Sequence, residues 1–84
     1  MPTVKCLVAT ICDEAGKGIE GATMLVQELN KKAVSDILGV ADIESMKPGM
    51  YHVLFSADGY ASQTQILKIE QGRTIDEEVR MVRV

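Results

Sequence analysis

The sequence predicts an all-β protein, a seven-stranded antiparallel β-sandwich. Short segments rich in β-branched and apolar residues recur along the chain, and turn sequences separate them at fairly regular spacing. No segment carries convincing helix caps at both ends. Because 84 residues suffice for only one domain, residues 1–84 are expected to form a single sandwich.

The first two strands are expected on either side of a glycine-rich loop. Residues 3–12 are mostly β-branched or apolar, and Asp13-Glu14-Ala15-Gly16 follows with Asp and Gly where a type I turn prefers them. Residues 22–29 form the second expected strand. Asn30-Lys31-Lys32 is expected to be the polar turn that ends it.

The middle of the chain predicts three further strands. Residues 33–36 and 40–45 are short strands joined by a second Asp-x-x-Gly turn, Asp36-Ile37-Leu38-Gly39. Lys47-Pro48-Gly49 then breaks the chain, and residues 50–57 alternate clearly between two faces.

Residues 62–70 and 74–83 are the last two expected strands. A helix over residues 73–84 is the alternative for the last one, because its apolar residues fit either period. The alternation along all strands assigns an inner face to the sandwich. The residues expected on it are Leu7, Ala9, Ile11, Ala22, Met24, Val26, Tyr51, Val53, Phe55, Leu67, Ile69, Val79 and Met81.

The composition excludes several classes of protein. Hydrophobic residues make up 46% and charged residues 25%, which argues against intrinsic disorder. The longest apolar runs are far shorter than the roughly 20 residues of a membrane-spanning helix. A formal net charge of -3 offers no basic surface for nucleic acid. We therefore expect neither nucleic-acid binding nor membrane insertion.

The two cysteines are expected to be free thiols on the outward face of the first strand. Cys6 and Cys12 are six positions apart, which in one strand is roughly 20 Å. A disulfide needs Cα atoms within about 7 Å, so an internal bridge is not expected.

The order of the turn motifs resembles a known family, the carboxypeptidase regulatory-like domain of the transthyretin-like (prealbumin-like) group. The motifs that carry this resemblance follow the family's order, and the resemblance covers roughly residues 5–82. They are Ala9-x-Ile11-x-Asp13-x-x-Gly16, Ile19-x-Gly21-Ala22-x-Met24-x-Val26, Ser35-Asp36-x-x-Gly39, Met46-x-Pro48-Gly49-x-Tyr51-x-Val53 and Ala57-Asp58-Gly59-Tyr60. The resemblance implies a Greek-key β-sandwich.

Three positions depart from the family pattern. Ala9 replaces a glycine of the first strand, Gly18 replaces a loop proline, and Ala41 replaces an aromatic residue. We expect Ala41 to thin the core, with a methionine, Met24, Met46 or Met50, filling the space.

The resemblance implies a non-catalytic structural or protein-interaction module. Such domains accompany peptidases, outer-membrane receptors and surface proteins, so the expected partner is another protein or a host polypeptide. A weak homo-oligomer stays open. The alternative is a peptide- or carbohydrate-binding module that uses a loop end, with Tyr51 or Tyr60 stacking on the ligand. The expected compartment is cytoplasmic for a complete chain, and periplasmic or cell-surface for a domain of an exported protein.

Catalysis, metal binding and cofactors are not expected. His52 is the single histidine and lies on an outward register without a positioned nucleophile. The related hydroxyisourate hydrolases need several histidines and a C-terminal Tyr-Arg-Gly-Ser that this chain lacks. Asp13 and Asp36 stand at turn positions where a carboxylate caps backbone N–H groups, which explains them without a metal.

Ile37 and Leu38 are the candidate partner contacts. Two large aliphatic residues at the tip of a hairpin turn are unusual, since side chains there face solvent. Either the tip folds back over the end of the sandwich, above Met46 or Met50, or it contacts a partner or a second copy of the chain.

Overall fold

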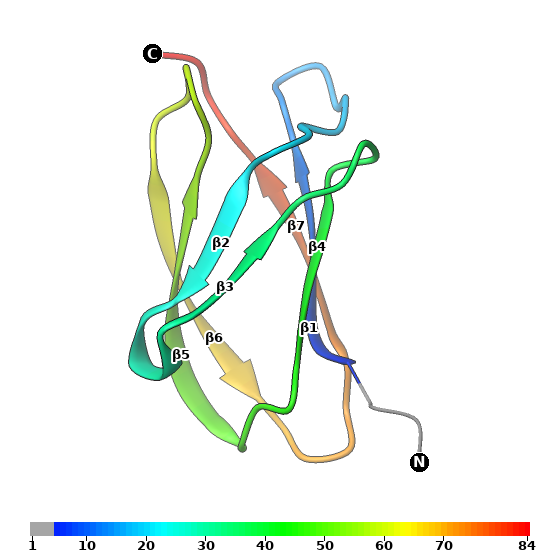
Figure 1. The fold of residues 1–84 in the computed structure, drawn as a ribbon, viewed down its shortest axis with the longest axis vertical. Helices are drawn as coiled ribbons and strands as arrows, with labels where there is room; N and C mark the ends of the chain where they lie inside the picture. Colours follow the sequence, from blue (N-terminus) through cyan, green and yellow to red (C-terminus); the bar gives the residue numbers. More distant parts are fainter. Residues whose placement is uncertain (1–4) are drawn as a thin grey trace.

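A computed structural model describes residues 5–84 of the chain as two packed β-sheets (Figure 1). The strands are β1 (Lys5–Cys12), β2 (Thr23–Val26), β3 (Lys31–Val34), β4 (Val40–Glu44), β5 (Gly49–Ser56), β6 (Gln63–Ile69) and β7 (Ile75–Arg80). One sheet has the order β4-β1-β7 and the other the order β3-β2-β5-β6. The expected seven-stranded sandwich is confirmed. In this part of the chain no helix is long and apolar enough to cross a membrane.

One strand pair corrects the prediction of a wholly antiparallel sandwich. β1 and β7 run parallel, with Leu7 opposite Ile75 and Cys12 opposite Arg80. Parallel neighbours need a crossover connection, and here five strands lie between β1 and β7 in the chain, four of them in the other sheet. The helical alternative for residues 73–84 is wrong, because Ile75–Arg80 lies in this strand pair.

The second correction concerns residues 27–32. Gln27–Leu29, expected to end the second strand, form a 3-10 turn (η1). Asn30 follows in the left-handed conformation at φ 50°, and Lys31 and Lys32, expected in the turn, begin β3 instead. The hairpin closes at the pair Val26–Lys31, so the four residues between them must reverse the chain.

The core lies between the sheets, and every residue of the predicted inner face is buried in it. Ala41 and Ile43 of β4 are buried there too, and Met24 and Met46 belong to the same cluster of core residues. Met50, the third methionine considered for filling the space beside Ala41, is exposed.

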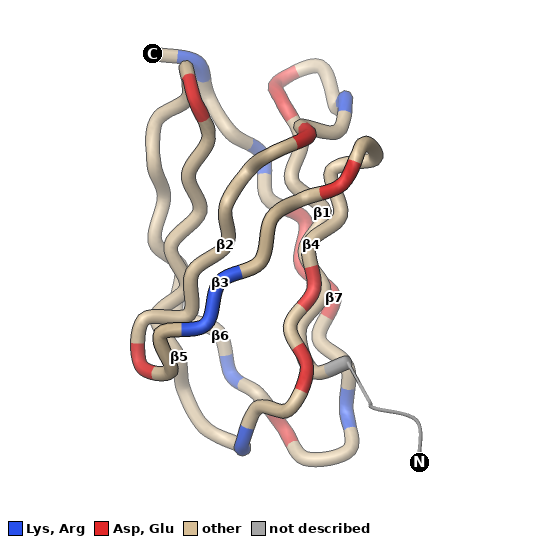
Figure 2. The backbone as a smooth tube through the Cα atoms, viewed as in Figure 1, with Lys and Arg blue, Asp and Glu red and all other residues tan. Residues whose placement is uncertain are grey.

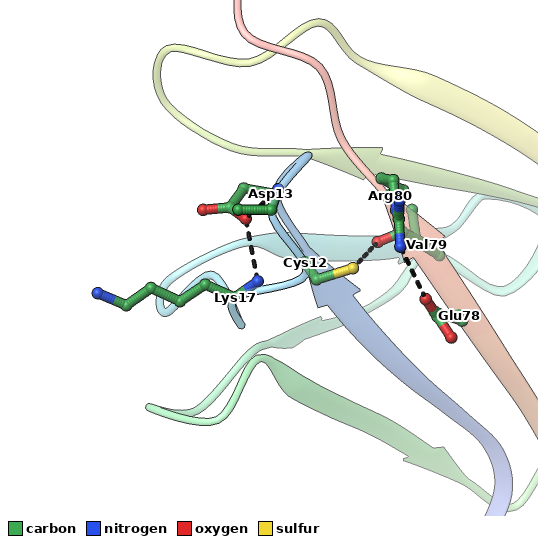
Figure 3. A network of polar contacts seen from close by, with 7 residues as sticks. Cys12, Asp13, Lys17, Glu78, Val79 and Arg80 are labelled. Atoms are coloured by element: carbon green, nitrogen blue, oxygen red, sulfur yellow. Dashed lines mark hydrogen bonds and ion pairs between the residues drawn. The ribbon is translucent and has the colours of Figure 1, made fainter.

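The two cysteines form no disulfide, as predicted, but the placement of Cys12 differs from the prediction. Cys12 is only 3% exposed, because the chain folds back at Gly18 to bridge it and its thiol donates to the Val79 carbonyl at 3.5 Å (Figure 3). Cys6 lies where the β1–β4 register shifts, and its sulfur accepts the Met46 N–H at 3.3 Å. Cys12 is therefore part of the packed interior and not of an outward face.

Candidate functional site

The turn that carries Ile37 and Leu38 is held by the side chain of Asp36. Its carboxylate oxygen Oδ1 accepts the backbone N–H groups of Leu38 at 2.9 Å and Val40 at 3.0 Å. The Asp36 carbonyl accepts the Gly39 N–H at 2.9 Å, and Gly39 adopts φ 85°, which glycine tolerates best. The Asp36 N–H also donates to the Val40 carbonyl at 3.0 Å, so four hydrogen bonds within residues 36–40 hold the turn.

The base of the turn is also fixed to the rest of the sandwich. The Ile11 N–H donates to the Gly39 carbonyl at 2.7 Å, which joins the turn to β1. Ser35, the buried residue just before the turn, accepts the Ala22 N–H at 2.8 Å and donates its hydroxyl to the Ile19 carbonyl. These contacts give the tip a defined position relative to the core.

The tip itself is exposed. Ile37 is 75% and Leu38 is 71% accessible to solvent. Of the two alternatives, the one in which the tip folds back over the end of the sandwich, above Met46 or Met50, is wrong. The 36–39 turn precedes β4 and residues 45–48 follow it, so the tip and Met46 lie at opposite ends of this strand (Figure 1). The described chain leaves both aliphatic side chains uncovered.

A second turn of the same construction provides a comparison. Asp13 Oδ1 accepts the N–H groups of Ala15 at 2.9 Å and Lys17 at 3.0 Å (Figure 3), and the Gly16 N–H donates to the Asp13 carbonyl at 3.0 Å. Its tip is Glu14-Ala15 instead of two aliphatic residues. The Asp-x-x-Gly turn therefore does not require apolar side chains at its tip, although the 36–39 turn carries them.

The carboxylates of Asp13 and Asp36 act as the sequence predicts, by capping backbone N–H groups. No group of three or more His, Cys, Asp or Glu side chains among residues 5–84 is placed to hold a metal ion.

His52 is exposed, as predicted, but it has a partner that the sequence did not indicate. Its ring nitrogen Nδ1 lies 2.6 Å from Glu28 Oε2, and its backbone N–H donates to Glu28 Oε1 at 2.8 Å. The hydrogen bond from the His52 ring, followed by the one from its backbone N–H, lowers the pKa of the Glu28 carboxyl below its ordinary value of 4.5. Glu28 lies on η1, so this pair fastens the β2–β3 connection to β5.

The two tyrosines make different contacts. Tyr51 is buried, as predicted, and its hydroxyl donates to the Lys47 carbonyl at 2.6 Å. A hydroxyl that bonds to the backbone a few residues upstream is typical of a corner tyrosine in a β-sandwich. Tyr60 instead pairs through its backbone with Arg83, whose guanidinium lies 5.7 Å from the centre of the Tyr60 ring.

One open groove lies along the side of the sandwich, with a volume of about 450 Å³. It is lined by Lys31 and Lys32 of β3 and by Asp42, Ile43 and Glu44 of β4. Lys31 spans the two sheets there, donating to the carbonyls of Glu44 and Ser45. The groove is not at a loop end, so a ligand at a loop end stays a prediction.

The sequence profile of the carboxypeptidase regulatory-like domain matches residues 7–82. The chain belongs to this family. No protein of curated function matches this carboxypeptidase regulatory-like domain at the level of sequence.

Solved structures share the fold of this carboxypeptidase regulatory-like domain at low sequence identity. The Bacillus anthracis TIE protein superposes with a TM-score of 0.82 at 19% identity, covering 98% of this chain and 17% of that one. A chain of a mutant type II cohesin–X-dockerin complex from Acetivibrio cellulolyticus gives 0.69 at 18% identity, covering 93% of this chain and 57% of that one. The C-terminal domain of the Caf1A usher gives 0.57 at 9%, covering 92% and 96%. This chain thus spans only part of the length of the first two matched structures.

Proposed function

We propose that this domain is a non-catalytic protein-interaction module that binds a partner protein through Ile37 and Leu38. The observation that carries the proposal is the exposure of two adjacent large aliphatic side chains on a turn with a fixed backbone. Burying each of them in a partner's apolar pocket is worth roughly 1.5–3 kcal/mol. Because the turn is already ordered, little conformational entropy is lost when it binds.

The family and the structural neighbours support an interaction module. The cohesin–X-dockerin structures are complexes between proteins. For the Caf1A usher C-terminal domain, conserved hydrophobic clusters on the surface are important for F1 antigen assembly. We propose a similar role for the exposed apolar residues of this chain.

The absence of catalysis is part of the proposal. His52 is engaged with Glu28, and Ser56 lies four residues further along β5 with Leu54 between them on the same outward register. Neither residue belongs to a nucleophile–base–orienter arrangement.

Site-specific photo-crosslinking in the native host tests the proposal. A photoreactive side chain replaces Leu38, and a matched control carries it at Ala15, the equivalent position of the Asp13 turn. We expect a discrete protein adduct from position 38 and none from position 15. Adding Ile37→Ser to the position-38 probe should reduce the yield at least several-fold. Equal adducts from both positions would refute the proposed role of the tip.

A further inference from the structure

The outer edge of β6 differs from the other three free edges of the sandwich. β3, β4, β6 and β7 each end a sheet, so each presents unpaired backbone groups along one side. Figure 2 shows lysines on β3 and acidic residues on β4 and β7, whereas β6 is uncharged over most of its length. From Gln63 to Leu67 it reads Gln-Thr-Gln-Ile-Leu, and its single charge is Lys68. Charged side chains normally protect edges from pairing, and β6 has the fewest.

The hydrogen-bond pattern shows which β6 residues face the free edge. The His52 N–H donates to Glu28, on the side of β5 away from β6. In an antiparallel pair the backbone groups of alternate residues point to alternate sides, so His52 and its partner Ile66 do not bond to each other. The N–H and C=O groups of Thr64, Ile66 and Lys68 therefore point outward from the sheet edge.

The side chain at the centre of this edge is apolar and exposed. Ile66 is 59% accessible on the outer face of the sheet. Ile66 lies directly opposite His52 on β5, and Met50, which is 58% accessible, and Leu54, which is half-buried, lie two positions to either side of His52. A row of unpaired backbone donors and acceptors and the exposed apolar side chain of Ile66 thus lie at the same edge.

We propose that a second copy of this chain pairs with the outer edge of β6, antiparallel and centred on Ile66. A two-fold axis at Ile66 places Ile66 opposite Ile66 and Thr64 opposite Lys68, all residues whose backbone groups point outward. The two Ile66 side chains then lie about 4.5–5.5 Å apart at Cβ, within contact distance. The pairing joins the two β3-β2-β5-β6 sheets into one continuous sheet.

The charged side chains of the edge strands favour self-pairing through β6. In the β6 pairing Lys68 faces the neutral Thr64 of the other copy, so no like charges meet. β7 carries three carboxylates, β3 two lysines and β4 two carboxylates, so antiparallel self-pairing of any of these strands would gather like charges at the new interface. With the single charge of Lys68, β6 gathers the least like charge of the described edge strands.

The association is expected to be weak, because a single strand pair buries less than the area of a standard interface. It is separate from the proposed function, since β6 and the 36–39 tip belong to different sheet edges.

Sedimentation velocity of the full chain over a concentration series up to about 1 mM tests the proposal. Ile66→Lys places two like charges opposite each other and should weaken association at least tenfold. Ile66→Pro removes an outward N–H without removing a β5–β6 bond, and should act in the same direction. Thr10→Lys, on the exposed outer face of the other sheet, adds the same charge and should leave association within twofold of the wild type.

Hydrogen exchange gives a second readout that does not depend on a variant. As the protein concentration rises, the amides of Thr64, Ile66 and Lys68 should exchange several-fold more slowly, while those of Gln65 and Leu67 stay unchanged.

A chain that is monomeric throughout the sedimentation series would overturn the proposal. So would an Ile66→Lys variant that folds and associates like the wild type. Loss of association in Ile37→Ser with Leu38→Ser, but not in Ile66→Lys, would assign the contact to the tip instead.

Discussion

Gly18 packs against the carbonyl group of Leu38 so closely that a β-carbon on Gly18 would lie 2.1 Å from the Leu38 oxygen. A β-carbon on Gly39 would in turn lie 2.8 Å from the Gly18 Cα. The loop after β1 and the 36–39 turn therefore meet backbone to backbone. This contact explains why glycine stands at position 18, where the family pattern has a proline, since any larger residue would displace the tip.

Gly18→Ala is predicted to destabilise the domain. Forcing a methyl group against the Leu38 backbone should cost about 1–3 kcal/mol, and each 1 kcal/mol lowers the melting temperature of a domain this size by about 4–8 °C. Thermal unfolding followed by circular dichroism measures the effect. Gly16→Asn is the control in the same loop, because its site is open and Asn tolerates the left-handed conformation there. A Gly18→Ala variant that melts with the wild type would show that the two loops are not in contact.

Asp36→Ala is predicted to loosen the tip and to reduce stability. The substitution removes the acceptor of two backbone N–H groups, which is worth about 1 kcal/mol, as for a lost helix cap. Asp36→Asn keeps an oxygen at that position and should retain most of the stability. Chemical denaturation provides the free energy of unfolding.

Asp13→Ala is the control that distinguishes an effect of Asp36→Ala on stability from an effect on binding. It removes the matching pair of hydrogen bonds from the other turn, so it should cost a similar free energy. Only Asp36→Ala should also lower the photo-crosslinking yield at position 38. Equal yields from both variants would mean that the order of the tip does not matter for binding.

The sequence predicted the core well because alternation along a strand is a local signal. Met24, Val53 and Phe55 were assigned inward from their spacing alone, and each is fully buried. The two Asp-x-x-Gly turns were equally predictable, since turn chemistry is set within four residues.

What the sequence missed depends on contacts between distant residues. The parallel pairing of β1 with β7 follows from how the chain passes between sheets, which no local pattern encodes. Cys12 is buried because the loop after it returns at Gly18. The Glu28–His52 pair joins positions 24 residues apart. It forms only because residues 27–29 leave the strand that they were expected to extend.

The Glu28–His52 pair predicts a pH dependence of stability. The pKa of Glu28 is lowered in the folded chain, so its ionised form stabilises the fold. This contribution should be complete above the ordinary carboxyl pKa of 4.5 and should be lost as pH falls through the lowered value. Urea unfolding of the wild type and Glu28→Gln, from neutral pH to about pH 3, measures it.

Glu28→Gln should be less stable than the wild type near neutral pH, and the difference should vanish at the acid end. Glu14→Gln, on the exposed tip of the Asp13 turn, serves as the control and should show no such difference. A constant gap between Glu28→Gln and the wild type at every pH would argue against a role for the carboxylate charge.

The double change Ile37→Ser with Leu38→Ser is predicted to leave the fold intact. Both side chains are largely solvated already, so replacing them should change the free energy of unfolding by no more than about 0.5 kcal/mol. Phe55→Ala, at a fully buried position, should cost about 3–5 kcal/mol in the same denaturation experiment. With stability unchanged, a loss of partner adducts in the serine variant would report binding alone. A fall of several degrees in its melting temperature would instead mean that the tip contributes to the packing of the domain.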